Sequence, residues 1–195
     1  MANLVSSSLP RGRGRPREFD MEAALDKAAR VFRERGYHAT SIADLTGAME
    51  LASGSVYKAF KDKRAVFLAV FDREAGVRGE KLHRMISAAK FGRDRVRAAL
   101  TFYAKSSYGV EGRRGCLVVG SAAELVTFDA RVAQRVTAAL HRNEKLMADL
   151  IRQGQADGSI PATIDSETTG RLMMCLLQGM RVAGKIGRAS CRERV

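Results

Sequence analysis

Residues 40–63 read TSIADLTGAMELASGSVYKAFKDK, and this segment predicts two short helices joined by a tight turn. Ser41 and Asp44 form a Ser-x-x-Asp capping box, which satisfies exposed amides at the start of the first helix. The apolar residues of that helix recur on one face, as Ile42, Leu45 and Met49. The segment therefore predicts a helical hairpin that packs by its apolar faces.

The second helix is expected to begin near Ser53, with Val56 and Phe60 turned toward the core. Its outward face carries small, hydroxylated, aromatic and cationic residues, namely Ser53, Gly54, Ser55, Tyr57 and Lys58. A helix that enters a DNA major groove needs small residues where its backbone approaches the duplex, hydroxyls for base edges and phosphates, and a cation for the DNA backbone. The alternative is a hairpin with an ordinary polar face, and periodicity alone does not separate the two.

The same segment carries a family signature. The matching residues are Thr40-Ser41, Asp44-Leu45, Gly54-Ser55-Val56-Tyr57, Phe60 and Asp62-Lys63. With their surroundings in residues 19–71, they resemble the N-terminal signature of the TetR/AcrR family of one-component transcriptional repressors. The resemblance implies an all-α homodimer. Its N-terminal three-helix helix-turn-helix domain would bind operator DNA, and its C-terminal helical domain would hold a small-molecule inducer and form the dimer.

The resemblance also implies which side chains of this domain contact the operator. They are Thr40, Ser41, Ser53, Gly54, Ser55, Tyr57, Lys58 and Lys63. In the family a lysine at the position of Lys63 holds a phosphate, and the N-terminus of a helix capped by Asp62 favours an anion there.

Two residues of the turn depart from the family pattern. Glu50 stands where the family usually has glycine, and Ala52 stands where it usually has the serine that caps the second helix. A left-handed conformation at Glu50 would cost about 1 kcal/mol, and a lost cap costs about the same. We expect Ser53 to take over the cap by a shift of one residue.

A basic arm precedes this domain. Residues 11–17 read RGRGRPR, in which glycine and proline disfavour helix and four arginines repel one another. The core of this run is similar to the AT-hook motif, and the focused negative potential of a narrow minor groove attracts arginine, here Arg13 and Arg15. The alternative is a solvated tail that adds only non-specific affinity. We favour this alternative, because charge runs are usually solvated.

Composition agrees with a cytoplasmic all-α protein. The 195 residues are 46% apolar with three prolines and no tryptophan, and no stretch is long enough for a membrane span or forms a secretory signal. The net charge of +13 suggests a polyanionic partner, but residues 1–64 carry only +4 of it, from 12 Lys and Arg against 8 Asp and Glu. Charge therefore does not mark the DNA-binding end.

Motifs of enzymes, metal sites and cofactor sites are missing from the sequence. There is no Gly-x-Ser-x-Gly, His-Glu-x-x-His or phosphate-binding loop, and the odd number of cysteines, three, favours free thiols. We therefore expect no catalysis, no cofactor and no metal. The alternative to a DNA-binding regulator is a basic helical module that binds a membrane surface or another protein, although no helix has one cationic and one strongly apolar face.

We expect four parts along the chain: a flexible arm over residues 1–17, the helix-turn-helix domain over 18–64, a helical regulatory domain over 65–185, and a tail over 186–195. The first helix should run from its cap Asp20 to Gly36. A helix capped by Asp62 should continue into the regulatory domain. Such a shared helix can transmit a tilt between the two domains.

The regulatory domain shows further helical segments. One starts at Arg93 and ends near residues 108–109, a basic loop follows at 111–115, a long helix opens at Asp129 and a last one opens at Asp165. The last helix carries a stripe of Leu172, Met173, Leu176, Leu177 and Met180, part of which faces a partner subunit in the family. By position only, the candidate pocket residues are Tyr103, Tyr108, Cys116, Met147, Met174 and Gln178.

Cys116 allows two interpretations. The segment 115–124 resembles one in which some electrophile-responsive family members place a sensing cysteine, and Arg113 and Arg114 would lower the pKa of its thiol. The other interpretation, which we favour, is a small buried hydrophobe, because the run Cys-Leu-Val-Val is typical of a core.

The family usually supplies one more long helix after the position of Gly184. Here residues 186–195 read IGRASCRERV, without an apolar stripe or a cap, and resemble a translated read-through. We therefore expect an incomplete regulatory domain, a foreign tail and a homodimer that forms poorly.

Overall fold

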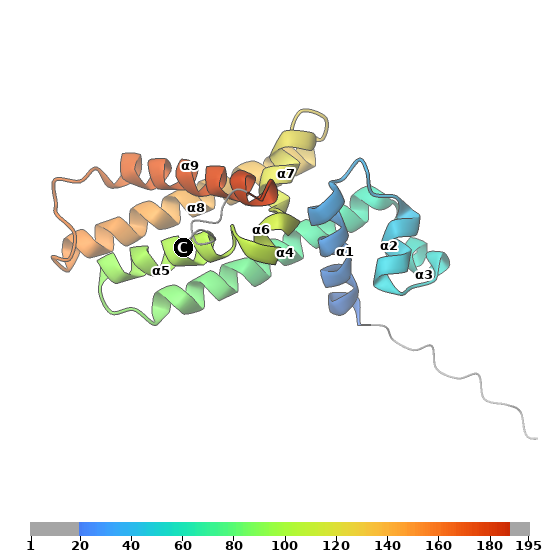
Figure 1. Ribbon diagram of the computed structural model, residues 1–195, viewed down its shortest axis with the longest axis horizontal. Helices are drawn as coiled ribbons and strands as arrows, with labels where there is room; N and C mark the ends of the chain where they lie inside the picture. The colour runs from blue at the N-terminus through green and yellow to red at the C-terminus, as the bar shows by residue number, and fades with distance from the viewer. Residues whose placement is uncertain (1–19, 188–195) are drawn as a thin grey trace, which may run out of the picture.

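The computed structural model describes residues 20–187, and that range contains helices and no strand (Figure 1). At one end lie three helices, α1 (Met21–Arg35), α2 (Ile42–Met49) and α3 (Ser53–Ala59). The long α4 (Lys63–Ser87) leads from this unit into the larger part of the molecule. The expected all-α class is confirmed, and the helix capped by Asp62 continues to Ser87 as predicted.

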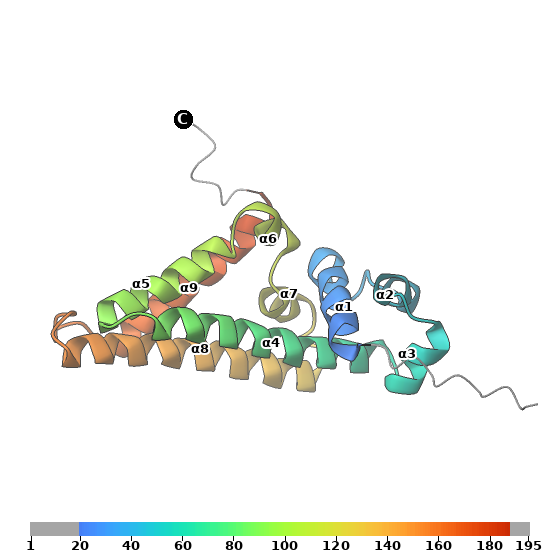
Figure 2. The same ribbon diagram turned by 90° about the horizontal axis from the view of Figure 1, so that it is seen from below.

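The larger part contains α5 (Gly92–Lys105), α6 (Gly109–Arg114), α7 (Leu117–Glu124), α8 (Ala130–Ala156) and α9 (Ser166–Lys185). Helix α5 packs against α4 and α8, and α9 packs along α8. Figure 2 shows α6 and α7 at the junction between α1 and this bundle. No helix in the described range is long and apolar enough to cross a membrane.

Two apolar clusters hold the helices together. The first joins α1, α2, α3 and the start of α4 to α7 and α8, and at its centre Phe67 meets the rings of Phe32 and Tyr37 edge to face. The second joins the end of α4 to α5, α8 and α9 around Met147 and Leu177. The first cluster extends from the three N-terminal helices into α7 and α8, so the N-terminal unit shares its core with the larger part of the molecule.

Side chains at the helix starts confirm most of the predicted caps. Asp20, Asp62, Asp129 and Asp165 each accept backbone N–H groups of the following helix, and the capping box at Ser41 is complete. These local signals fix where α1, α2, α4, α8 and α9 begin.

The turn before α3 differs from one expectation. Glu50 has a φ of 57°, the left-handed conformation expected where the family has glycine. Ser53, however, does not take over the cap: Ala52 occupies the N-cap position and offers no side-chain hydrogen bond. The predicted one-residue shift was wrong, because α3 already includes Ser53.

The larger part of the molecule corrects one further prediction and refines a second. The segment 111–115, expected as a loop, lies mostly in the short helix α6, and the preceding α5 ends at Lys105. The predicted apolar stripe of α9 divides: Leu177 is buried, whereas Leu172 and Leu176 are 59% and 62% exposed. The buried face is instead the line Gly170, Met174, Leu177, Arg181 and Gly184.

Two predicted segments lie outside the described residues. The basic arm with Arg13 and Arg15 falls within residues 1–19, and the tail expected over 186–195 falls within 188–195 except for its first two residues.

Candidate DNA-reading helix and regulatory cavity

Helix α3 presents the face that its sequence predicts. Val56 is 1% exposed and fixes the helix to the first apolar cluster, while Tyr57 is 56% exposed. Ser53, Gly54 and Lys58 are exposed as well, and nothing lies within 4 Å of the position where Gly54 would carry a Cβ. A duplex can therefore approach the start of α3 closely.

Thr40 and Lys63 have structural roles in this protomer. Thr40 is 1% exposed and its hydroxyl donates to the carbonyl of Gly36 at 2.6 Å, so its side chain is turned away from the surface of α3. Lys63 is half-buried, and its ammonium donates to the carbonyls of Tyr37 and Thr40 at 3.0 and 2.9 Å. The structure thus does not place the Thr40 side chain for a DNA contact, and it commits two donors of Lys63 to the loop between α1 and α2.

Ser41 is exposed, but its hydroxyl is committed to the capping box. Its oxygen accepts the N–H of Asp44 at 3.0 Å and its proton is donated to the Asp44 carboxylate at 2.7 Å. Of the eight DNA contacts predicted within the described range, five lie together on α3: Ser53, Gly54, Ser55, Tyr57 and Lys58.

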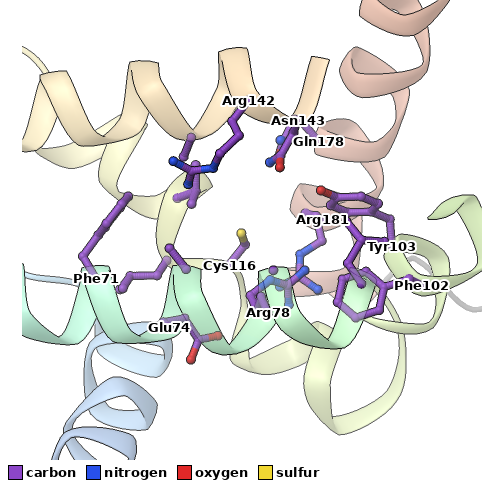
Figure 3. Close-up of a pocket in the computed structure, with 16 residues that line it drawn as sticks. Phe71, Glu74, Arg78, Phe102, Tyr103, Cys116, Arg142, Asn143, Gln178 and Arg181 are labelled. Carbon is purple, nitrogen blue, oxygen red and sulfur yellow. The ribbon is translucent and has the colours of Figure 1, made fainter. Parts of the chain in front are cut away.

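A cavity of about 80 Å³ lies between the two apolar clusters (Figure 3). Its wall is formed by α4, α5, α7, α8 and α9 together with Cys116, the residue before α7. Three of the six predicted pocket residues line it: Tyr103, Cys116 and Gln178.

The other three predicted pocket residues do not line this cavity. Tyr108 is 52% exposed at the start of α6, on the protein surface. Met147 and Met174 are buried in the second apolar cluster, where neighbouring side chains fill the space around them. Helical periodicity correctly placed both methionines on buried faces, but it carries no information on where packing leaves a void.

Three arginines in the wall were missed: Arg78 on α4, Arg142 on α8 and Arg181 on α9. Figure 3 shows them approaching Cys116 from three different helices. A signal for Arg181 was present, because it follows Met174 and Leu177 at helical spacing on an otherwise apolar face. Nothing local distinguishes Arg78 or Arg142 from solvated arginines.

The positive charges act on the Cys116 thiol. Burial raises its pKa, but the nearby guanidinium groups of Arg181 and Arg78 outweigh that effect, and the net pKa lies below the ordinary value. Cys116 lines the cavity, and a lowered thiol pKa is one condition for a reactive thiol. Within residues 20–187, no group of His, Cys, Asp or Glu side chains is arranged to hold a metal ion.

Hydrogen bonds connect the cavity wall to α1. The carbonyl of Gly115 accepts Arg181 Nη2 at 3.1 Å and Arg33 Nε, from α1, at 3.0 Å. Lys185 of α9 donates to the carbonyls of Arg33 and Glu34 at 2.8 Å each. Arg181 of α9 and Arg33 of α1 thus donate to the same carbonyl, so a shift of Arg181 can change the contact that holds α1.

Comparison with known proteins explains this arrangement. Residues 24–70 match the model of bacterial regulatory proteins of the tetR family, and residues 92–194 match the model of the tetracyclin repressor-like C-terminal domain. The second match alone covers more than half of the chain. The chain belongs to the TetR family.

Individual relatives of this TetR-family chain agree. The transcriptional repressor ComR of Escherichia coli is 29% identical over 192 residues, which cover 96% of this chain and 90% of ComR. The repressor DhaR of a Mycobacterium species is 26% identical over 84% of this chain and 81% of DhaR. A solved structure of a cysteine mutant of the TetR family regulator CifR, complexed with a 26-base-pair operator, is 32% identical, covers 88% of this chain and 90% of that chain, and has a TM-score of 0.78.

These relatives are regulators of transcription, and so the chain is a DNA-binding regulator rather than an enzyme. The alternative of a membrane-surface or protein-interaction module without specific DNA binding is not favoured.

Proposed function

We propose that this TetR-family regulator is a repressor that holds a palindromic operator through α3 of each subunit and releases it when a small-molecule inducer occupies the cavity. The observation that carries the DNA half is the exposed face of α3, where Tyr57 and Lys58 project from a helix fixed at Val56. In a dimer the two α3 helices would enter successive major grooves about 34 to 36 Å apart.

The hydrogen bonds of Gly115 support a route for induction. A ligand that draws Arg181 toward itself competes with the Gly115 carbonyl, which also anchors Arg33 of α1. Release then follows if the ligand has a higher affinity for the arrangement in which α1 and α3 no longer match the operator.

A homodimer is part of this proposal. Leu172, Leu176 and Met180 form an exposed apolar line on α9, which a second subunit would cover. A mass measurement at micromolar concentration tests the homodimer, and a monomer at that concentration would contradict it. Because operator DNA lies in the bacterial cytoplasm, we propose that location as well.

The test uses a duplex selected from a randomised library with the wild-type protein. Tyr57→Ala and Lys58→Ala are each expected to weaken binding to it by about tenfold, the effect of one lost side-chain contact. Lys90→Ala, an exposed lysine beyond the far end of α4, is the matched control and should leave the affinity unchanged. Unchanged affinity in both α3 variants would contradict the proposed DNA contacts.

The basic arm is tested on the same duplex with the double variant Arg13→Ala/Arg15→Ala. Loss of two phosphate-directed charges is expected to weaken binding to all duplexes and to reduce the slope of log affinity against log salt by about two. A loss confined to A·T-rich operators would instead indicate insertion into the minor groove.

A further inference from the structure

The cavity wall holds three positive charges and hardly any negative charge to balance them. Arg78, Arg142 and Arg181 all line it, and none of them forms an ion pair with a described carboxylate. The one acidic residue in the wall is Glu74. Its carboxylate lies 3.8 Å from Arg33 of α1, and Figure 3 shows it on the side of α4 away from Arg142.

Arg181 is the group that most needs a partner. It is 3% exposed, and its two terminal nitrogens donate to the backbone carbonyls of Ser106 and Gly115. Its Nε is the one buried side-chain nitrogen or oxygen in the described part of the chain without a hydrogen-bond partner. A buried charge with an unused donor is costly unless an anion or acceptor completes it.

The two other arginines extend this charge toward the opening of the cavity. The guanidinium carbon of Arg78 lies 5.2 Å from the centre of the Phe102 ring, a position that leaves its nitrogens free to donate at their edges. Arg142 is exposed at the opening. The remaining wall is largely apolar and includes Phe71, Leu82 and Val118.

We propose that the cavity is a site for a small carboxylic acid with an apolar body, whose carboxylate is held by Arg181 and Arg78 and whose entry is guided by Arg142. The inference rests on the proposed function, because it names the chemical class of the inducer. Guanidinium donors match the planar carboxylate. The apolar wall receives the rest of the molecule.

The competing explanation is that the Cys116 thiolate already balances the arginines, since its charge and that of Arg181 attract each other. The variant Cys116→Ser separates the two. If an external carboxylate is the natural counter-charge, Cys116→Ser keeps or strengthens its binding, because a competing anion has been removed. If binding is lost with the sulfur, the proposal is overturned.

Benzoate is the probe, and benzamide, which has nearly the same shape without the charge, is its control. Isothermal titration on the full chain at constant ionic strength is expected to show benzoate binding at least about tenfold tighter than benzamide, the effect of one charge-assisted hydrogen bond. Benzoate should also raise the unfolding temperature in proportion to its occupancy. Equal affinities for the two compounds would overturn the charge-based site.

Variants then locate the site. Arg78→Gln is expected to weaken benzoate binding by about tenfold and Arg142→Gln by about threefold, with benzamide unaffected by either. The matched control is Arg131→Gln, an exposed arginine on α8 that does not line the cavity. An equal loss in Arg131→Gln would show that overall charge rather than the cavity attracts the anion. Arg181→Lys tests the buried end of the cavity, where Arg181 lies. Lysine keeps the positive charge, so this test does not depend on a variant without that charge.

The same preparations are tested on the selected duplex. Intact DNA binding with no preference for benzoate over benzamide refutes the carboxylate site and leaves the regulator in place. Absence of sequence-specific DNA binding in the wild type refutes the proposed function, whichever compound binds. Benzoate binding that is weakened about tenfold in Arg78→Gln but kept in Arg131→Gln supports the site.

Discussion

The DNA-binding unit and the cavity wall share α4, but their side chains are packed in opposite ways. Around Phe67, aromatic and aliphatic side chains close on one another, and Lys63 and Thr40 find their partners in nearby backbone. Around Arg181, three cationic groups from separate helices converge on a space that the chain leaves unfilled. The side chains of the first region are satisfied by one another and by nearby backbone. The cavity wall has the composition of a binding site, because its arginines form no ion pair with a described carboxylate.

Phe67→Ala should have the largest effect and tests the completeness of the first region. The ring is 1% exposed and contacts Phe32, Tyr37 and Phe71, so truncation should lower the free energy of unfolding by about 3 to 5 kcal/mol. Chemical denaturation measures it, with Phe91→Ala, an exposed ring, as control. A loss below about 1 kcal/mol would show that this core is not closed.

Gly184→Ala tests the close packing behind the cavity. A Cβ there would lie 1.9 Å from the carbonyl oxygen of Ser107, and because backbone must move, we expect a loss of about 1 to 3 kcal/mol in unfolding free energy. Gly179→Ala on the same helix meets nothing within 4 Å and should stabilise α9 by about 0.5 to 1 kcal/mol. Similar results for both variants would contradict the tight contact of α9 with Ser107.

Asp129 joins the two regions and gives a prediction on pH. Hydrogen bonds from Arg64, together with backbone N–H groups at the start of α8, lower its pKa from 3.8 to about 2. A carboxyl with a lowered folded-state pKa stabilises the protein above the unfolded-state value, and this stabilisation is lost as pH falls toward 2. Asp129→Ala is therefore expected to cost about 1 to 2 kcal/mol at neutral pH and less at pH 2.

Asp129→Asn is the matched variant, because asparagine keeps the cap and loses the charge. Its cost should be about half that of alanine, since the Arg64 side chain is 40% exposed and solvent screens the ion pair. If Asp129→Asn costs nothing at any pH, the ion pair between α4 and α8 contributes nothing measurable.

Ala52→Ser should have the smallest effect. It adds a capping side chain to α3 in the DNA-binding unit. The N-cap of α3 lacks a side-chain hydrogen bond, and a serine hydroxyl there should add about 0.5 to 1 kcal/mol of stability. Ser53→Ala should be nearly neutral for stability, because Ser53 is already inside the helix. A large loss in Ser53→Ala would restore the capping role that its sequence position suggested.

The same contrast explains what the sequence could and could not predict. The start of α2 follows from Ser41 with Asp44, and the exposed face of α3 follows from Val56 beside Tyr57. Both predictions depend on residues within a few positions of one another, and both are confirmed. The cavity depends on which faces of five helices meet and where packing fails to close. Tyr103 and Gln178 line the cavity, Met147 lies in the second apolar cluster instead, and Arg78 carries no local signal at all.

The shared carbonyl of Gly115 has a consequence for how ligands would be ranked. A ligand that binds the Arg181 guanidinium replaces the Gly115 carbonyl as its hydrogen-bond partner. Such a ligand does not have to push the helices apart. Potency among inducers would then depend on how strongly the acid group accepts hydrogen bonds from the guanidinium, in addition to how well the apolar body fits the wall.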